Sequence, residues 1–130
     1  MFASNIETMK ELTKAEEQIM QVLWKRGKSV IRDIISDMGD PKPAYNTVAT
    51  FLKILEKKEF VGREPVANAF FYFPLVERED YTEKFLGNFT KRYFEGSVKK
   101  MISFFIDNDD ITIQEFEELQ QYFEKKKRKK

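Results

Sequence analysis

A helical segment that runs directly into an aromatic hairpin is the feature that most restricts how this chain can fold. Residues 45–58 repeat large apolar side chains at helical spacing, at Val48, Phe51, Leu52 and Leu55. Residues 61–73 follow at once, with strand-forming side chains before and after a turn at residues 65–69 that carries proline and asparagine. We therefore expect a mainly α-helical fold with one small β-hairpin.

Two shorter helices are expected before this segment. Thr13 and Glu16 have the spacing of a capping box, in which a hydroxyl and a carboxylate each accept a hydrogen bond from an orphan backbone amide. The first helix should end near residues 26–27, and Ser29 should cap the second. Apolar side chains mark the inward faces of the two helices, at Ala15, Ile19, Val22 and Leu23, then at Val30, Ile34, Ile35 and Met38. Three helices followed by a hairpin predict a winged helix-turn-helix domain.

The outward face of the third helix is predicted to contact DNA. It carries small, polar and cationic side chains, at Asn46, Thr47, Ala49, Thr50, Lys53 and Lys57. Asparagine can pair with adenine, threonine can bond bases or phosphate, and methyl groups can meet the thymine methyl. The alternative is a solvated face without a partner. The position of this helix, third in its unit and directly before a hairpin, favours DNA.

The hairpin is predicted to lie along a DNA backbone. Arg63 and the amides of Asn68 and Ala69 at the tip are placed to reach phosphate oxygens. The alternative is that Phe71 and Phe73 only cover the core while the tip contacts nothing.

After Pro74 the pattern changes to three short helices with broad apolar faces. Tyr81, Phe85, Phe89 and Tyr93 recur every four residues, and a break at residues 96–97 precedes the next helix. That helix should turn Val98, Met101, Ile102, Phe105 and Ile106 inward, and a second capping box at Thr112 and Glu115 opens a last helix with Ile113, Phe116, Leu119 and Phe123. So few residues are marginal as an independent core. We therefore predict two domains, a DNA-binding domain over residues 1–75 and a helical dimerisation domain over residues 76–130. The dimer contacts are expected at Phe85, Phe89, Tyr93, Met101, Ile102, Phe105, Phe116, Leu119 and Phe123.

Composition excludes several function classes. The 130 residues include neither cysteine nor histidine, which removes disulfides, thiolate nucleophiles, the usual zinc ligands and imidazole bases. An enzyme is not expected, nor is a metal or a cofactor.

The net charge of +1 is unevenly distributed along the chain. Residues 42–63 hold five basic and two acidic residues, whereas residues 77–124 hold six basic and twelve acidic residues. The six basic residues at 125–130 are read as a solvated end, with DNA contact as the alternative. Without a long apolar run or a signal peptide, the protein is expected to be cytoplasmic, with no membrane insertion.

Several stretches together resemble the penicillinase-repressor family, the BlaI/MecI-type winged-helix repressors. They are Leu-Thr-Lys-Ala-Glu at residues 12–16, Val-Leu-Trp at 22–24, Tyr-Asn-Thr-Val-Ala-Thr at 45–50, Leu-Glu-Lys-Lys at 55–58, Phe-Val at 60–61, Phe-Tyr at 71–72 and Phe-Glu-Gly-Ser at 94–97. The resemblance implies a homodimer that binds pseudo-palindromic operator DNA and represses transcription of resistance or stress genes. By position, Asn46, Thr47 and Thr50 would face bases, while Tyr45, Lys53 and Arg63 would hold the backbone. Lys42 is included among the DNA-binding residues.

The chain departs from the family pattern at two places. In the family, a membrane sensor protease can relieve repression by cutting an Asn-Phe bond, and the equivalent pair here is Phe104-Phe105. Glu59 stands where the family often has glycine, so either the turn into the hairpin is strained or the helix ends differently. The family also has a copper-sensing branch that uses C-terminal cysteines. This chain has no cysteine, so copper sensing is excluded.

Two functions from different classes follow. The first is a homodimeric repressor whose partners are double-stranded operator DNA, a second copy of the chain and a membrane sensor protease. The alternative is a winged-helix module that binds protein through its aromatic hairpin, without sequence-specific DNA binding.

Overall fold

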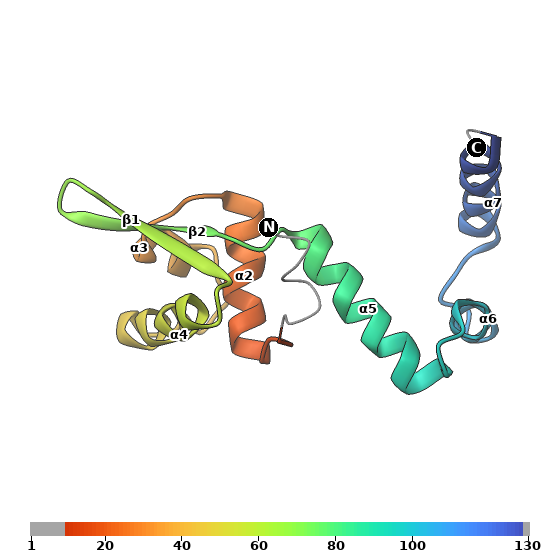
Figure 1. Ribbon diagram of the computed structural model, residues 1–130, viewed down its shortest axis with the longest axis horizontal. Helices are drawn as coiled ribbons and strands as arrows, with labels where there is room; N and C mark the ends of the chain where they lie inside the picture. Colours follow the sequence, from red (N-terminus) through yellow and green to blue (C-terminus); the bar gives the residue numbers. More distant parts are fainter. Residues whose placement is uncertain (1–9, 129–130) are drawn as a thin grey trace. The chain divides into compact units, whose positions relative to one another are not determined.

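The computed structural model describes residues 10–128 and divides the chain into two compact units, Met1–Phe85 and Leu86–Lys130. The helices and strands of the first unit are α2 (Lys14–Arg26), α3 (Ile31–Ser36), α4 (Tyr45–Lys57), β1 (Val61–Val66) and β2 (Ala69–Pro74). Helix α5 (Arg78–Phe94) starts in the first unit, and α6 (Val98–Asp107) and α7 (Ile113–Arg128) belong to the second (Figure 1). The predicted fold class, mainly helical with one hairpin, is confirmed.

Helix α2 begins and ends as its sequence predicts. The Thr13 hydroxyl accepts from the Glu16 amide at 3.3 Å, and a Glu16 carboxylate oxygen accepts from the Thr13 amide at 2.9 Å, which completes the capping box. Gly27 ends the helix with a φ of +88°, a backbone conformation that costs glycine little.

The start of α3 differs from the prediction. Ser29 does not cap the helix, because the cap position is Val30, which makes no side-chain cap hydrogen bond. Ser29 instead forms an isolated bridge with Tyr72, with amide–carbonyl distances of 2.9 and 2.8 Å, and its hydroxyl donates to the Gly27 carbonyl. Ser29 therefore pairs with β2 through its backbone and does not cap α3 as the local pattern predicts. Ile31 is the buried residue at the start of this helix, whereas the sequence predicted Val30.

Helix α4 ends in a Schellman motif centred on a glutamate. The Phe60 amide donates to the Leu55 carbonyl at 2.9 Å, and the Glu59 amide donates to the Glu56 carbonyl at 3.0 Å. Glu59 has a φ of +66°, the left-handed conformation that a side chain disfavours. Of the two outcomes expected at this position, strain in the turn is therefore the one that occurs.

The hairpin is longer and its turn tighter than the sequence suggests. Strands β1 and β2 pair antiparallel from Val61 opposite Pro74 to Val66 opposite Ala69, so the turn holds two residues, 67–68, instead of the expected 65–69. A Cβ atom at Gly62 would lie 2.7 Å from the Phe73 ring, so a side chain at this position would force the ring to move. Tyr72 is the buried aromatic residue of β2, while Phe71 and Phe73 are only half-buried.

The core of the first unit joins all of its helices to the hairpin and to the start of α5. Its buried side chains are Ile19, Met20, Leu23, Ile31, Ile34, Val48, Leu52, Leu55, Phe60, Val61, Tyr72, Val76 and Tyr81. The Tyr81 hydroxyl accepts from the Leu12 amide at 2.9 Å, and the Trp24 indole donates to the Val76 carbonyl at 2.8 Å. The first unit thus extends beyond residue 75, where the sequence suggested a domain boundary.

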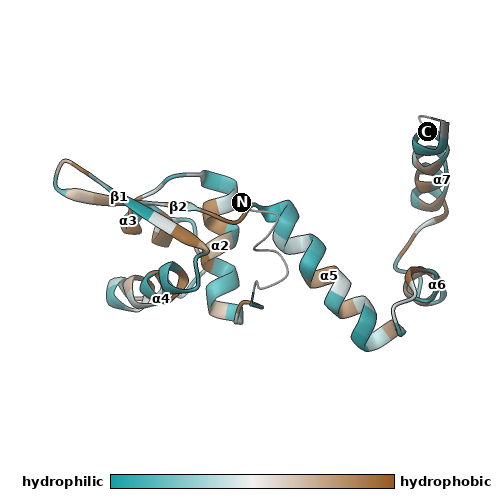
Figure 2. Ribbon diagram, in the orientation of Figure 1, coloured by the Kyte–Doolittle hydropathy of each residue, from teal (hydrophilic) through white to brown (hydrophobic). Residues whose placement is uncertain are grey.

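The second unit has its predicted caps but little buried surface. The Ser97 hydroxyl accepts from the Lys100 amide at 3.1 Å, and Thr112 and Glu115 form the second capping box with both distances at 3.0 Å. Among residues 86–127, Thr90 is the one buried residue. Figure 2 shows apolar residues alternating with polar ones along α5, α6 and α7. Within residues 10–128, no helix has the length and apolar character needed to cross a membrane.

Candidate nucleic-acid interface

Helix α4 turns a polar face to solvent, as predicted. Val48, Leu52 and Leu55 are buried on one side. The opposite side carries the exposed residues Asn46, Thr47, Thr50, Lys53 and Lys57, with Ala49 half-buried beside them. Small side chains at these places let another molecule approach the helix backbone closely. The Thr50 hydroxyl donates to the Asn46 carbonyl at 2.9 Å, so its oxygen is left as an acceptor.

The start of α4 offers backbone donors. Ala44 occupies the cap position and makes no side-chain hydrogen bond to the first turn, and no acidic residue lies in that turn. The exposed amides and the helix dipole together favour an anion here. Tyr45, the first residue of the helix, is 58% exposed beside these amides. This end of α4 therefore suits a phosphate group.

Lys42 and Lys58 are both engaged within the protein. The Lys42 ammonium donates to the carbonyls of Ser36, at 3.1 Å, and Met38, at the end of α3. The Lys58 ammonium lies 2.8 and 3.0 Å from the two carboxylate oxygens of Glu16. Glu16 is only 2% exposed; burial alone would raise the pKa of its carboxyl group, but the hydrogen bonds from Lys58 and Thr13 outweigh it and lower the pKa.

The hairpin is joined to its surroundings by two charged pairs. Arg63 on β1 places its Nε 3.2 Å from a Glu56 carboxylate oxygen at the end of α4, and its guanidinium lies 4.3 Å from the centre of the Phe70 ring. Glu64 forms an ion pair with Lys28, in the loop between α2 and α3. The sequence predicted a role for Arg63 but gave no sign of its contacts with Glu56 and Phe70. The local sequence around Glu56, in the last turn of α4, does not show that its partner lies on β1, beyond the turn that follows the helix.

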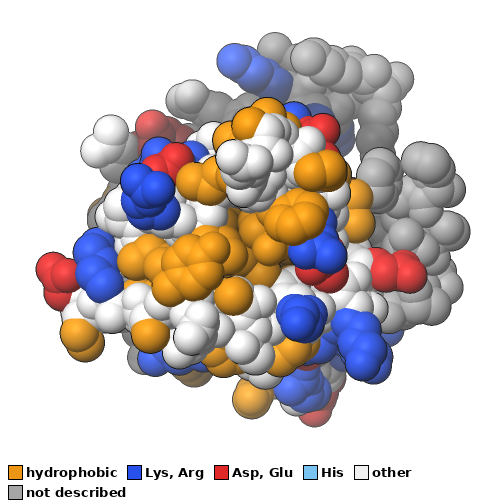
Figure 3. All heavy atoms as spheres, turned by 90° about the vertical axis from the view of Figure 1, so that its left-hand side faces the viewer, with side chains coloured by type: hydrophobic (Ala, Val, Ile, Leu, Met, Phe, Trp, Pro, Cys, Tyr) orange, Lys and Arg blue, Asp and Glu red, His pale blue; other side chains and the backbone are white. Residues whose placement is uncertain are grey.

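A shallow hollow of about 280 Å³ lies between the hairpin and the starts of α3 and α4. It is lined by Val30, Ile31, Arg32, Tyr45, Asn68, Ala69, Phe70 and Tyr72. Figure 3 shows this end of the first unit, with apolar side chains gathered in the middle of the face and lysines and arginines, together with some acidic side chains, around it. The apolar and aromatic groups of this hollow suit the sugars of a nucleic acid, and Arg32 suits a phosphate.

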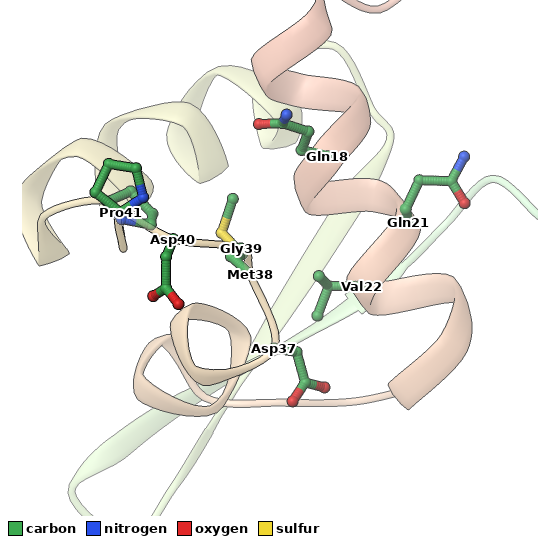
Figure 4. A pocket seen from close by; sticks show the side chains of 9 residues that line it. Gln18, Gln21, Val22, Asp37, Met38, Gly39, Asp40 and Pro41 are labelled. Atoms are coloured by element: carbon green, nitrogen blue, oxygen red, sulfur yellow. The ribbon is translucent and has the colours of Figure 1, made fainter.

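A larger hollow, of about 530 Å³, lies between α2 and the loop that leads to α4. Figure 4 shows side chains of α2 on one side and residues 37–41 on the other. Its charged lining residues are Asp37 and Asp40, and Asp37 is already paired with Arg26 at 2.8 Å. An acidic lining repels phosphate, so this hollow does not extend the basic surface of α4.

The residues predicted for dimerisation lie along α5, α6 and α7. Phe89, Met101, Ile102 and Phe105 are half-buried, whereas Phe85, Tyr93, Phe116, Leu119 and Phe123 are exposed. None of the residues of α6, all of which the structure describes, is buried. Phe104 and Phe105 lie within α6, where the Phe104 ring is 5.7 Å from that of Phe94. In the part of the chain that the structure describes, no cluster of acidic residues is arranged to hold a metal ion.

Comparison with known proteins adds a family relationship. A family model described as penicillinase repressor matches residues 12–125. The penicillinase repressor of Bacillus licheniformis is 27% identical over 121 residues, which cover 92% of this chain and 94% of that protein. The methicillin resistance regulatory protein MecI of Staphylococcus aureus (strain N315) is 28% identical over 117 residues, covering 89% and 95%. The solution structure of the DNA-binding domain of the repressor BlaI aligns with a TM-score of 0.49 and 24% identity, over 56% of this chain and 90% of that one.

Proposed function

This chain belongs to the penicillinase repressor family, and on that premise we propose that it is a homodimeric transcriptional repressor that binds pseudo-palindromic operator DNA. Helix α4 acts as the recognition helix in the major groove, and the hairpin acts as the wing along the backbone. The role is regulatory, without catalysis, and it is exercised in the cytoplasm. The single observation that carries the proposal is the polar, small-residue face of α4, exposed next to a wing that carries Arg63.

Base recognition is assigned to the outward side chains of α4. Asn46, Thr47 and Thr50 face bases, and each good side-chain pairing with a base contributes about 1–3 kcal/mol of discrimination. Ala49 allows close approach at the same face. Phosphate contacts come from Lys53, Lys57 and Arg63, with Tyr45 at the helix start and Lys42 after leaving its α3 carbonyls. These contacts are independent of base sequence and weaken with salt.

Dimerisation is part of the binding mechanism. One winged helix with few free cations has little electrostatic attraction for DNA, whereas two linked copies bind two half-sites, the second at high effective concentration. The exposed apolar side chains of α6 and α7 support this step: Phe104 of α6 is 51% exposed, and Ile113 and Phe123 of α7 are 81% and 67% exposed. Association with a second copy would remove such surface from water.

Relief of repression by a membrane sensor protease belongs to the same proposal. The bond between Phe104 and Phe105 lies within α6, so a protease that binds extended chain reaches it only after local opening of the helix. The mass of the chain recovered from cells before and after derepression identifies a cut between these residues, if one is made.

Binding to DNA tests the proposal directly. The full-length chain is incubated with a pool of random duplexes, and the enriched sequences are determined. We expect an inverted repeat, bound with an affinity that falls steeply between about 50 and 200 mM salt. A chain that enriches no sequence even at low salt would contradict the repressor function and favour the protein-binding module.

A further inference from the structure

The contact between the wing and the end of the recognition helix combines a cation, an anion and an aromatic ring. Arg63 lies between the Glu56 carboxylate, 3.2 Å from its Nε, and the Phe70 ring, 4.3 Å from its guanidinium carbon. We propose that Glu56 and Phe70 are positioning residues, which hold the Arg63 guanidinium in the orientation that binds the DNA backbone. This inference rests on the proposed function.

The strand register explains why the ring and the guanidinium meet. Arg63 pairs with Tyr72 across the hairpin, so Phe70, two residues before Tyr72, is its diagonal neighbour on the same face. The guanidinium carbon lies over the ring, a favourable cation–π arrangement. Phe70 is itself exposed, so its place is not explained by burial in the core.

The geometry of the guanidinium leaves it able to bind a further anion. Its five N–H donors form a planar fork, and Glu56 is placed against Nε. The two terminal Nη groups, with four donors, are the part that grips a phosphate through paired hydrogen bonds. A side chain already fixed along its length loses less conformational freedom on binding than a mobile one.

The charge of Glu56 opposes its positioning effect, because a carboxylate close to DNA repels phosphate. Removing that charge should therefore tighten binding if Glu56 acts by its charge alone. Glu59 provides a matched control: it lies three residues further along, it is exposed, and it forms no ion pair in the described residues. Glu59→Gln removes the same charge from the same end of α4 without touching Arg63.

The experiment measures the affinity of the full-length protein for the duplex that the wild-type chain enriches from a random pool, as a function of salt. The variants are Arg63→Ala, Glu56→Gln, Glu59→Gln and the double variant Glu56→Gln/Arg63→Ala. Far-ultraviolet circular dichroism confirms that each is folded. We expect Arg63→Ala to weaken binding by about tenfold and to lower the salt slope by about one for each protomer. We expect Glu59→Gln to tighten binding slightly and Glu56→Gln to bind about threefold more weakly than Glu59→Gln.

The double variant separates positioning from charge. If Glu56 acts through Arg63, Glu56→Gln no longer weakens binding once Arg63 is alanine. Phe70→Leu should also weaken binding to the duplex. Phe70→Tyr keeps an aromatic face and should bind with the affinity of the wild-type chain. Equal affinities of Glu56→Gln and Glu59→Gln would overturn the inference, as would a Glu56 effect that persists without Arg63.

The inference and the proposed function fail in different ways. A wild-type chain that enriches no duplex overturns both. Sequence-specific binding that Arg63→Ala leaves unchanged overturns only the positioning of Arg63, and the repressor function stands.

Discussion

At the scale of single residues, Asn46 and Thr47 are the side chains to which we assign sequence discrimination. Asn46→Ala or Thr47→Ala removes hydrogen bonds to bases and leaves phosphate contacts in place. We expect the ratio of operator affinity to random-duplex affinity to fall by about tenfold, in fluorescence anisotropy titrations at one salt concentration. Lys53→Ala is the control, because it should weaken binding to both duplexes by the same factor. An unchanged ratio in both alanine variants would refute base contact by these residues.

Lys58 illustrates a residue whose role depends on a distant partner. Lys58 follows Lys57 in the region of the chain predicted to bind DNA, yet its ammonium pairs with Glu16, which lies at the start of α2. Helical periodicity shows on which side of α4 a residue lies, but it does not show which element packs there. The capping box predicted at Thr13 and Glu16 was confirmed, because both partners lie within one turn.

The Glu16–Lys58 pair predicts a pH-dependent contribution to stability. The pKa of Glu16 in the folded protein is lowered below its ordinary value of 4.5, so the unfolded chain takes up the proton first as pH falls. The contribution is complete above pH 4.5 and is lost as pH falls through the folded-state pKa. Lys58→Met should cost about 2 kcal/mol at pH 7, and the cost should shrink towards pH 3. Urea unfolding of both proteins across this range measures it.

Lys57→Met is the matched control for that experiment. Lys57 is the exposed neighbour of Lys58 on the same helix, so its replacement should change stability little, by an amount independent of pH. If the difference in free energy of unfolding between Lys58→Met and the wild-type chain were the same from pH 3 to pH 7, the ion pair would not stabilise the fold.

At the scale of the element, the end of α4 holds a strained residue. Glu59 has a φ of +66° at the position of a Schellman motif that favours glycine. Glu59→Gly should raise the free energy of unfolding by about 1 kcal/mol, because relief of left-handed strain exceeds the entropy that glycine adds to the unfolded chain. Urea titration measures the change, with Glu59→Ala as a control that keeps the strain. Equal or lower stability of Glu59→Gly would contradict it.

The same scale shows where local signals succeed and where they fail. Capping boxes, the Ser97 cap and the spacing of Val48, Leu52 and Leu55 were all predicted, because they depend on residues within one or two turns. The cap expected at Ser29 was wrong, since a bridge to Tyr72 competes for its backbone. The turn of the hairpin was also placed too broadly, because strand pairing continues to Val66 and Ala69 despite the proline.

At the scale of the whole molecule, the second unit is the part to which we assign association with a second copy. Phe105→Asp places a charge on the apolar face of α6 that we assign to the dimer interface, where it has no partner. We expect sedimentation equilibrium to show a dissociation constant raised by at least about tenfold. Ser103→Asp introduces the same charge on the other side of α6 and should leave the dimer intact. A stable dimer of Phe105→Asp would show that the interface lies elsewhere.

Sequence alone determined the order of elements and the polar face of α4, because these follow from short-range patterns of apolar, capping and turn residues. The family followed from stretches of sequence that resemble its members. Tertiary structure decided which predicted features share a core. Tyr81 and Phe85 belong to one regular stripe, yet Tyr81 is buried against Trp24 and Phe60, whereas Phe85 is exposed. It likewise decided that Arg63 lies between Glu56 and Phe70. Periodicity records the spacing of residues along one helix or strand, whereas packing depends on residues that are distant in the chain and meet only after folding.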